Sequence, residues 1–202
     1  MPRVSRRGAA AVALALLPAP ALAHSFPLDA PASYLFVLGT SVAWSDPAIL
    51  LMLVPLAIGC GLWGRSGLLR ILPYLLAGGL GGALIVLPPG PGFTRECVAA
   101  GLVLAVLVAL LPPPPGHYMR IGAVAVGALV MLQSLEGHGT ADLPWAILAG
   151  LVAAPLAILA AGTALVLLVS WALPYGWVRI GWRVAASWTA AVAAMYGAFL
   201  LR

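Results

Sequence analysis

Six long apolar stretches, separated by short polar or Pro/Gly-rich breaks, form the main pattern of this chain. They are residues 46–63, 68–87, 96–111, 121–135, 145–169 and 184–201. Their lengths are near the roughly 20 residues, at about 1.5 Å rise each, that cross the hydrocarbon core of a bilayer. The pattern predicts an all-α integral membrane protein with about six transmembrane helices.

The breaks between the stretches are rich in residues that end helices. Proline and glycine dominate residues 88–92, 112–116 and 174–176, as is typical of turns and loops. A further apolar run, residues 34–44, is too short to span and is expected to form a re-entrant or interfacial helix before the first span. Because no long linker or charge run divides the chain, we expect one membrane domain over residues 24–202.

The N-terminal segment has the three parts of a secretory signal peptide. Three arginines within the first seven residues precede an apolar core, residues 9–17, and the small-residue sequence Ala-Leu-Ala at 21–23. This order predicts a signal peptide over residues 1–23 that is cleaved to leave His24 first. The alternative is an uncleaved anchor.

Composition agrees with the assignment to a membrane and limits the kinds of partner that the protein is expected to bind. Hydrophobic residues make up 63% of the 202 positions and charged residues 7%, so a soluble fold would have to expose a very large apolar surface. The formal charge of +5 comes from ten scattered arginines and no lysine. Scattered arginines argue against a nucleic-acid partner, and membrane lipid is the expected surroundings.

The arginines also predict an orientation. With His24 outside, the loops after the first, third and fifth spans face the cytoplasm and hold five arginines. These are Arg65, Arg70, Arg120, Arg179 and Arg183, whereas only Arg95 and Arg202 fall outside. The positive-inside rule therefore favours a bacterial inner membrane, with the mature N-terminus and the 136–144 loop on the periplasmic side.

All five acidic residues fall on the outer side or at its boundary. They are Asp29, Asp46, Glu96, Glu136 and Asp142. An acidic outer mouth raises the local concentration of cations. Acidic residues are also simply tolerated on translocated loops, so both interpretations stay open at this point.

The loop around residues 135–144 carries the best candidate ligands. Its His138 imidazole lies close in sequence to the carboxylates of Glu136 and Asp142, and Asp46 stands at the mouth of the first span. Nitrogen and carboxylate ligands suit borderline divalent ions such as nickel, cobalt or zinc. After cleavage His24 would add an amine beside its imidazole. The alternatives are a hydrated loop histidine at 138 and a tail histidine at 24.

Motifs for catalysis or a resident cofactor are missing from the sequence. There is no Ser-His-Asp elbow, phosphate loop, HExxH helix or CxxC pair, and no histidine lies within a predicted span to hold haem. Cys60 and Cys97 fall near opposite ends of their spans, too far apart for a disulfide, and are expected to be free and buried. We expect no enzyme and no permanently bound cofactor.

The signal ending in Ala-His, the six spans and the Gly-His-Gly sequence at 137–139 resemble the HupE/UreJ family of putative nickel or cobalt permeases. The resemblance covers nearly the whole chain. Residues 44–47 and Met52 are similar to the family's HPxxGxDHxxAM signature, with Pro47 in place of a histidine. Residues 133–139 are similar to its FHGxAHGxE motif, with Ser134 in place of the first histidine. The resemblance implies capture of nickel or cobalt at the outer face.

Two hypotheses from different classes follow. The first is a permease for a divalent transition-metal ion, captured by His138, Glu136, Asp142 and Asp46. The second, motivated by the replaced histidines, is a non-transporting accessory or scaffold subunit, which would act in a homo-oligomer or with a membrane-complex partner. Within the transporter class, proton-coupled movement of a small solute through Glu96 or Asp46 is the other interpretation.

Overall fold

The computed structural model describes residues 30–85, 92–111, 113–135 and 143–202. These residues form seven α-helices and no strand. The helices are α2 (Ala32–Ser45), α3 (Pro47–Leu62), α4 (Gly67–Leu84), α5 (Thr94–Leu110), α6 (Gly116–Ser134), α7 (Trp145–Ala172) and α8 (Gly176–Leu200). All seven belong to one compact unit, Pro31–Arg202. The predicted all-α class is confirmed for this part of the chain, and the predicted signal peptide lies outside it.

Each of the six predicted apolar stretches falls on one helix, and residues 34–44 fall on α2. Two helices start earlier than predicted: α6 at Gly116 rather than 121, and α8 at Gly176 rather than 184. The prediction placed these starts after charged residues, but a helix backbone continues through an arginine. Proline fixes the start instead, because Pro115 precedes the first residue of α6 and has no N–H to donate.

Two helices are long and apolar enough by themselves to cross a membrane, α4 and α7. A third candidate is the pair formed by α2 and α3, which passes the same test together but bends by 76° at its junction. α3 and α5 have only 16 and 17 residues, less than the roughly 20 that cross a hydrocarbon core. The described chain is therefore all-helical with two or three candidate spans, as in a helical membrane protein.

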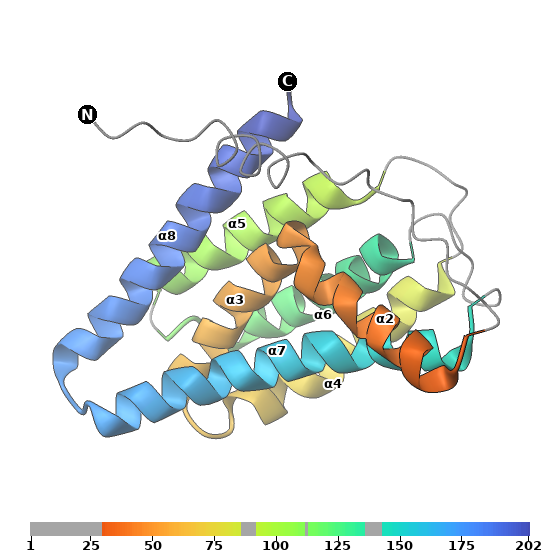
Figure 1. The fold of residues 1–202 in the computed structure, drawn as a ribbon. Coiled ribbons are helices and arrows are strands. Elements are labelled where there is room, and N and C mark those ends of the chain that lie inside the picture. Colours follow the sequence, from red (N-terminus) through yellow and green to blue (C-terminus); the bar gives the residue numbers. More distant parts are fainter. Residues whose placement is uncertain (1–29, 86–91, 112, 136–142) are drawn as a thin grey trace, which may run out of the picture. The chain divides into compact units, whose positions relative to one another are not determined.

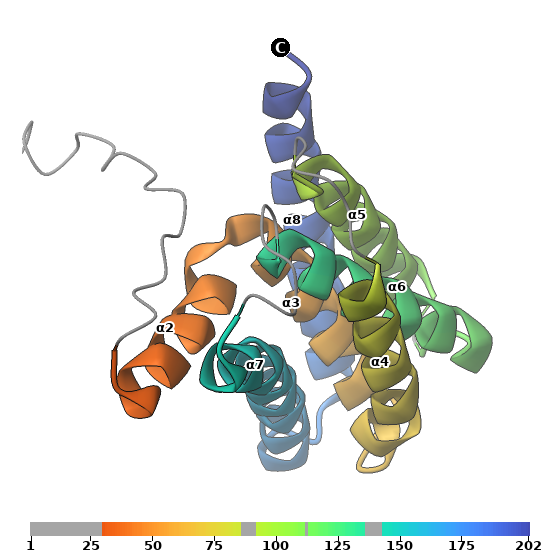
Figure 2. The ribbon, with the colours of Figure 1, turned by 90° about the vertical axis from the view of Figure 1, so that its right-hand side faces the viewer.

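Helix α3 lies at the centre of the unit, with the other six helices around it (Figures 1 and 2). Eleven of its 16 residues are buried. By contrast, only three of the 25 residues of α8 are buried, Val178, Ala186 and Ala193. Among the outer helices the closest neighbours are α4 with α6, α2 with α7 and α5 with α8. The hydrophobic core therefore follows α3.

Glycines allow two of these pairs to approach closely. A Cβ atom on Gly78 of α4 would collide with the backbone of Val124 in α6, and one on Gly82 would lie 2.5 Å from the Ala128 carbonyl oxygen. The α2–α7 pair is built in the same way at Gly39 and Gly150. The small residues at Gly78 and Gly82 thus allow α4 and α6 to pack closely.

Candidate functional site

The junction between α2 and α3 is fixed by Asp46. Pro47 restricts the preceding residue to extended backbone, and Asp46 accordingly has φ −90° and ψ 108°. Its backbone N–H donates to Val42 O at 3.1 Å and closes α2, while its Oδ1 accepts from the Ala48 N–H at 2.8 Å and caps α3. Asp46 is half-buried. The predicted ligand therefore already has a capping role that uses one carboxylate oxygen.

A second carboxylate lies near the same end of α3. Glu96 is exposed in the first turn of α5, and α5 packs against the first turns of α3, where a Cβ atom on Gly101 would lie 2.7 Å from Leu51 O. The Cys97 Sγ lies 3.9 Å from Leu129 O of α6. The starts of α3 and α5 and the last turns of α6 therefore meet at one end of the unit, which we call the acidic end.

The final residues of α6 bring two unpaired oxygens to the acidic end. Gln133 Oε1 and Ser134 Oγ are buried with no hydrogen-bond partner among the described residues, and Ser134 is only 7% exposed. Helical hydroxyls usually donate to a carbonyl three or four residues earlier. Thr40, Ser41, Ser45, Ser187 and Thr189 all do so. Ser134 differs from these five in having no partner among the described residues, and an unpaired buried hydroxyl is costly.

Beyond this end the interior is apolar. Within the described ranges the buried polar side chains are Ser134 and Thr163, and the Thr163 hydroxyl is already paired with Ala57 O at 3.5 Å. Cys60 and Cys97 are free and buried, as predicted. A hydrated ion therefore meets few polar side chains between the two ends of the helices.

Basic side chains gather at the opposite end. The turn after α3 and the link before α6 are joined there by a hydrogen bond from Trp63 Nε1 to Pro114 O at 2.8 Å. Arg65 lies in that turn, and Arg120 lies in the first turns of α6 with its guanidinium 5.5 Å from the Tyr74 ring centre. Arg183 of α8 donates to Ala109 O, at the end of α5, at 2.8 Å. These three arginines therefore lie at the end opposite Asp46 and Glu96.

The other predicted ligands lie outside the described residues. These are His24, Glu136, His138 and Asp142. The described neighbours of the 136–142 segment are Leu135 at the end of α6 and Leu143 before α7, and both are buried. The part of the chain that the structure describes contains no group of three or more His, Cys, Asp or Glu side chains able to hold a metal ion. Of the predicted set, the structure therefore places Asp46 alone.

Sequence reasoning missed two hydrogen bonds from arginine to a backbone carbonyl, one at each end of the α5–α8 pair. Arg95, in the first turn of α5, donates to Leu200 O of α8 at 3.1 Å, and Arg183 makes the reciprocal contact at the other end of the same helix pair. Both arginines satisfy carbonyls near a helix C-terminus, where no helical donor remains. Each arginine lies in the first turns of its helix. In an antiparallel pair this position is next to the C-terminal end of the neighbouring helix, so an arginine there can donate to that helix's last carbonyls.

No protein-family model, no curated protein and no solved structure matches this chain. The class of protein therefore rests on the structure: an all-helical protein, across the described residues, with two or three candidate membrane spans.

Proposed function

We propose that the protein is a membrane permease for a divalent transition-metal ion, nickel or cobalt, captured at the acidic end. The observation that carries the proposal is that the helix ends carrying Asp46, Glu96 and the buried, unpaired oxygens of Gln133 and Ser134 lie at one end of the unit. Oxygen donors and negative charge concentrate and hold cations. The loop with His138 begins directly after this end of α6 and supplies the nitrogen ligand.

The membrane arrangement belongs to the same proposal. Residues 1–23 are a cleaved signal peptide and six spans follow, with the acidic end and residues 136–144 on the periplasmic side of the inner membrane. The separation of Arg65, Arg120 and Arg183 from Asp46 and Glu96 supports this orientation, because positive residues remain on the cytoplasmic side. The resemblance to HupE/UreJ proteins favours nickel or cobalt as the ion.

Capture takes place in two stages in this account. His138, Glu136 and Asp142 take the ion from the periplasm, together with His24 where the cleaved N-terminus is free, and the free oxygen of Asp46 accepts it at the start of α3. Ser134 Oγ and Gln133 Oε1 then replace part of its water as it enters between α3, α5 and α6. Replacement of water is required because the interior beyond them is apolar.

Nickel binding by the purified protein tests the capture step. A ligand that binds only the folded state raises stability by about 2.7 kcal/mol at a concentration of 100 Kd. We expect nickel to raise the thermal unfolding midpoint of the wild type in mild detergent, and magnesium at the same concentration to leave it unchanged. The double variant His138→Ala, Asp46→Asn keeps the cap of α3 and should lose the nickel response. An undiminished response in this variant contradicts the proposal.

A non-transporting accessory or scaffold subunit is the second candidate. The apolar interior favours it, because Ser134 and Thr163 are the buried polar side chains of the described ranges and neither carries charge. Such a subunit should co-purify with a membrane partner or with a second copy. Purification as a stable monomer, with nothing retained in a mild-detergent pulldown, counts against this candidate.

A further inference from the structure

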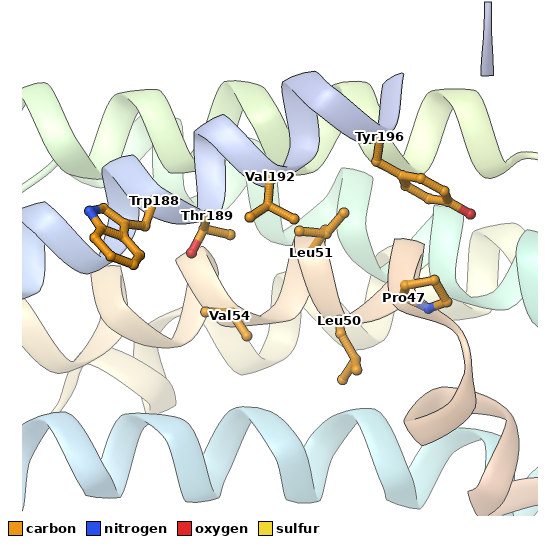
Figure 3. A pocket seen from close by; sticks show the side chains of 8 residues that line it. All are labelled: Pro47, Leu50, Leu51, Val54, Trp188, Thr189, Val192 and Tyr196. Atoms are coloured by element: carbon orange, nitrogen blue, oxygen red, sulfur yellow. The ribbon is translucent and has the colours of Figure 1, made fainter. Parts of the chain in front are cut away.

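An apolar groove runs along the outer surface between α3 and α8, apart from the buried oxygens of the acidic end. Its walls are formed by α3 residues between Pro47 and Val54 and by α8 residues between Trp188 and Tyr196, and its volume is about 490 Å³ (Figure 3). Val54 is 40% and Trp188 73% exposed. The central helix of the unit is therefore left uncovered along this side.

The shape and lining of the groove suit a hydrocarbon chain. Residues 47–54 and 188–196 each extend about 10–12 Å along their helices at 1.5 Å per residue, so the groove is long and runs parallel to them. The polar groups that α8 contributes to the lining are the Thr189 hydroxyl, the Tyr196 hydroxyl and the Trp188 indole N–H, and the remaining side chains are apolar. In a bilayer the hydrophobic effect does not favour this groove over other lipid, so an acyl chain is held there by van der Waals packing against its walls.

Charges of both signs lie at one end of the groove. Pro47 and Tyr196 mark that end in Figure 3, and Trp188 marks the other. Asp46 precedes Pro47 and uses one carboxylate oxygen to cap α3. One turn beyond Tyr196, Leu200 O accepts from the Arg95 guanidinium, and Arg95 is exposed. A carboxylate and a guanidinium thus stand at the end where a headgroup would lie.

We infer that the groove holds one acyl chain of a zwitterionic phospholipid with a primary ammonium headgroup, of the phosphatidylethanolamine type. Arg95 binds the phosphate, because a guanidinium donates to phosphate oxygens in a planar fork. Asp46 accepts from the ammonium, which has three N–H donors. The Tyr196 ring lies at the boundary between chain and headgroup, a position that tyrosine favours in membranes.

Native mass spectrometry of the purified full chain tests this inference. The protein is offered equal amounts of phosphatidylethanolamine, phosphatidylcholine and phosphatidylglycerol with the same acyl chains. We expect the wild type to retain one phosphatidylethanolamine. Phosphatidylcholine has no N–H donor for Asp46, and phosphatidylglycerol has no positive charge, so each should be retained about tenfold less, the effect of one lost charge-assisted hydrogen bond.

Two pairs of variants distinguish the contribution of the acyl chain to binding from that of the lipid headgroup. Val54→Trp fills the groove and should abolish retention, whereas Val103→Trp, at an exposed position of α5 outside the groove, should retain the lipid as the wild type does. Arg95→Gln keeps a donor for Leu200 O but loses the charge, and should retain about tenfold less lipid. Arg95→Lys keeps the charge but loses the planar fork, and its retention of the lipid should fall between those of the wild type and Arg95→Gln. Val192→Trp repeats the groove test from α8 if Val54→Trp fails to fold.

The inference is overturned if the three lipids are retained equally, or if Val54→Trp and Val103→Trp retain equal amounts. A dimer that Val54→Trp abolishes, with no lipid retained, would assign the groove to a second copy of the chain and also overturn it. Asp46 is shared with the proposed nickel site, so the variants are placed at Val54 and Arg95, which belong to neither the proposed nickel ligands nor the buried oxygens. Loss of lipid binding in these variants leaves the nickel response as a separate measurement.

Discussion

The Asp46 side chain has two roles, and substitutions can distinguish them. Its Oδ1 caps α3 through the Ala48 N–H, and its charge contributes to the acidic end. Asparagine keeps a capping oxygen without the charge, and alanine removes both. Comparing the two substitutions therefore distinguishes the contribution of Asp46 to the stability of the α2–α3 junction from its contribution to cation capture.

We expect Asp46→Ala to lower the free energy of unfolding by about 0.5–2 kcal/mol, the usual cost of losing an N-terminal cap. Asp46→Asn should stay close to the wild type, because asparagine caps helices as well as aspartate does. Thermal unfolding in mild detergent measures both. Equal destabilisation by the two substitutions would show that the charge of Asp46, rather than its capping hydrogen bond, stabilises the α2–α3 junction.

Ser134 differs from the other buried hydroxyl, that of Thr163, in having no partner among the described residues. Ser134→Ala should therefore leave stability unchanged or raise it by up to about 1 kcal/mol, because a buried hydroxyl without a partner is unfavourable. Thr163→Val should cost about 0.5–1.5 kcal/mol by removing the bond to Ala57 O. The same unfolding assay compares them, and a larger loss for Ser134→Ala contradicts the assignment of its oxygen to an incoming ion.

At the scale of elements, the α4–α6 pair depends on glycine at the contact. Gly78 faces the Val124 backbone, whereas Gly81, on the same helix, has no atom within 4 Å of an added Cβ. Side chains inserted into a packed contact cost about 1–3 kcal/mol, and small residues are what allow helices to approach closely in membranes.

Gly78→Leu should therefore lower the thermal midpoint clearly, and Gly81→Leu should change it little. Circular dichroism during heating gives the midpoint, and far-ultraviolet spectra at low temperature confirm that both variants are helical. The role of the Gly78 face is contradicted if the two leucine variants unfold at the same temperature.

The helices could be predicted from the sequence because they depend on local signals. Proline and glycine mark the breaks before α6 and α8, although both helices start earlier than predicted. The contacts of Arg95 and Arg183 could not be predicted in the same way, since their acceptors are backbone carbonyls about 70 to 105 residues away in sequence. The groove between α3 and α8 was also missed, because its lining has the same hydropathy as the core.

The candidate site was predicted in part. Asp46 was expected at the mouth of a span and lies at the corner between α2 and α3, but its capping role was not foreseen. Gln133 and Ser134 entered the sequence analysis only as part of the motif at residues 133–139, with Ser134 in place of a histidine. Their burial without partners depends on how α3, α5 and α6 pack, which hydropathy does not encode. His24, Glu136, His138 and Asp142 remain predictions.

At the scale of the whole described unit, the separation of charge along the helices is the feature that links fold to function. Asp46 and Glu96 mark one end, and Arg65, Arg120 and Arg183 the other. Between them the central helix α3 is largely buried among apolar side chains. Under the proposed function, the ion is selected at the acidic end, where the candidate ligands lie.

Uptake of nickel by liposomes that contain the purified protein tests this central claim most directly. The account predicts saturable uptake by the wild type and at least a tenfold loss in the His138→Ala, Asp46→Asn double variant, since two ligands of one ion are removed. Val103→Trp, remote from the acidic end, should transport as the wild type does. Equal uptake by the wild type and the double variant, or no uptake above protein-free liposomes by the wild type, would contradict it.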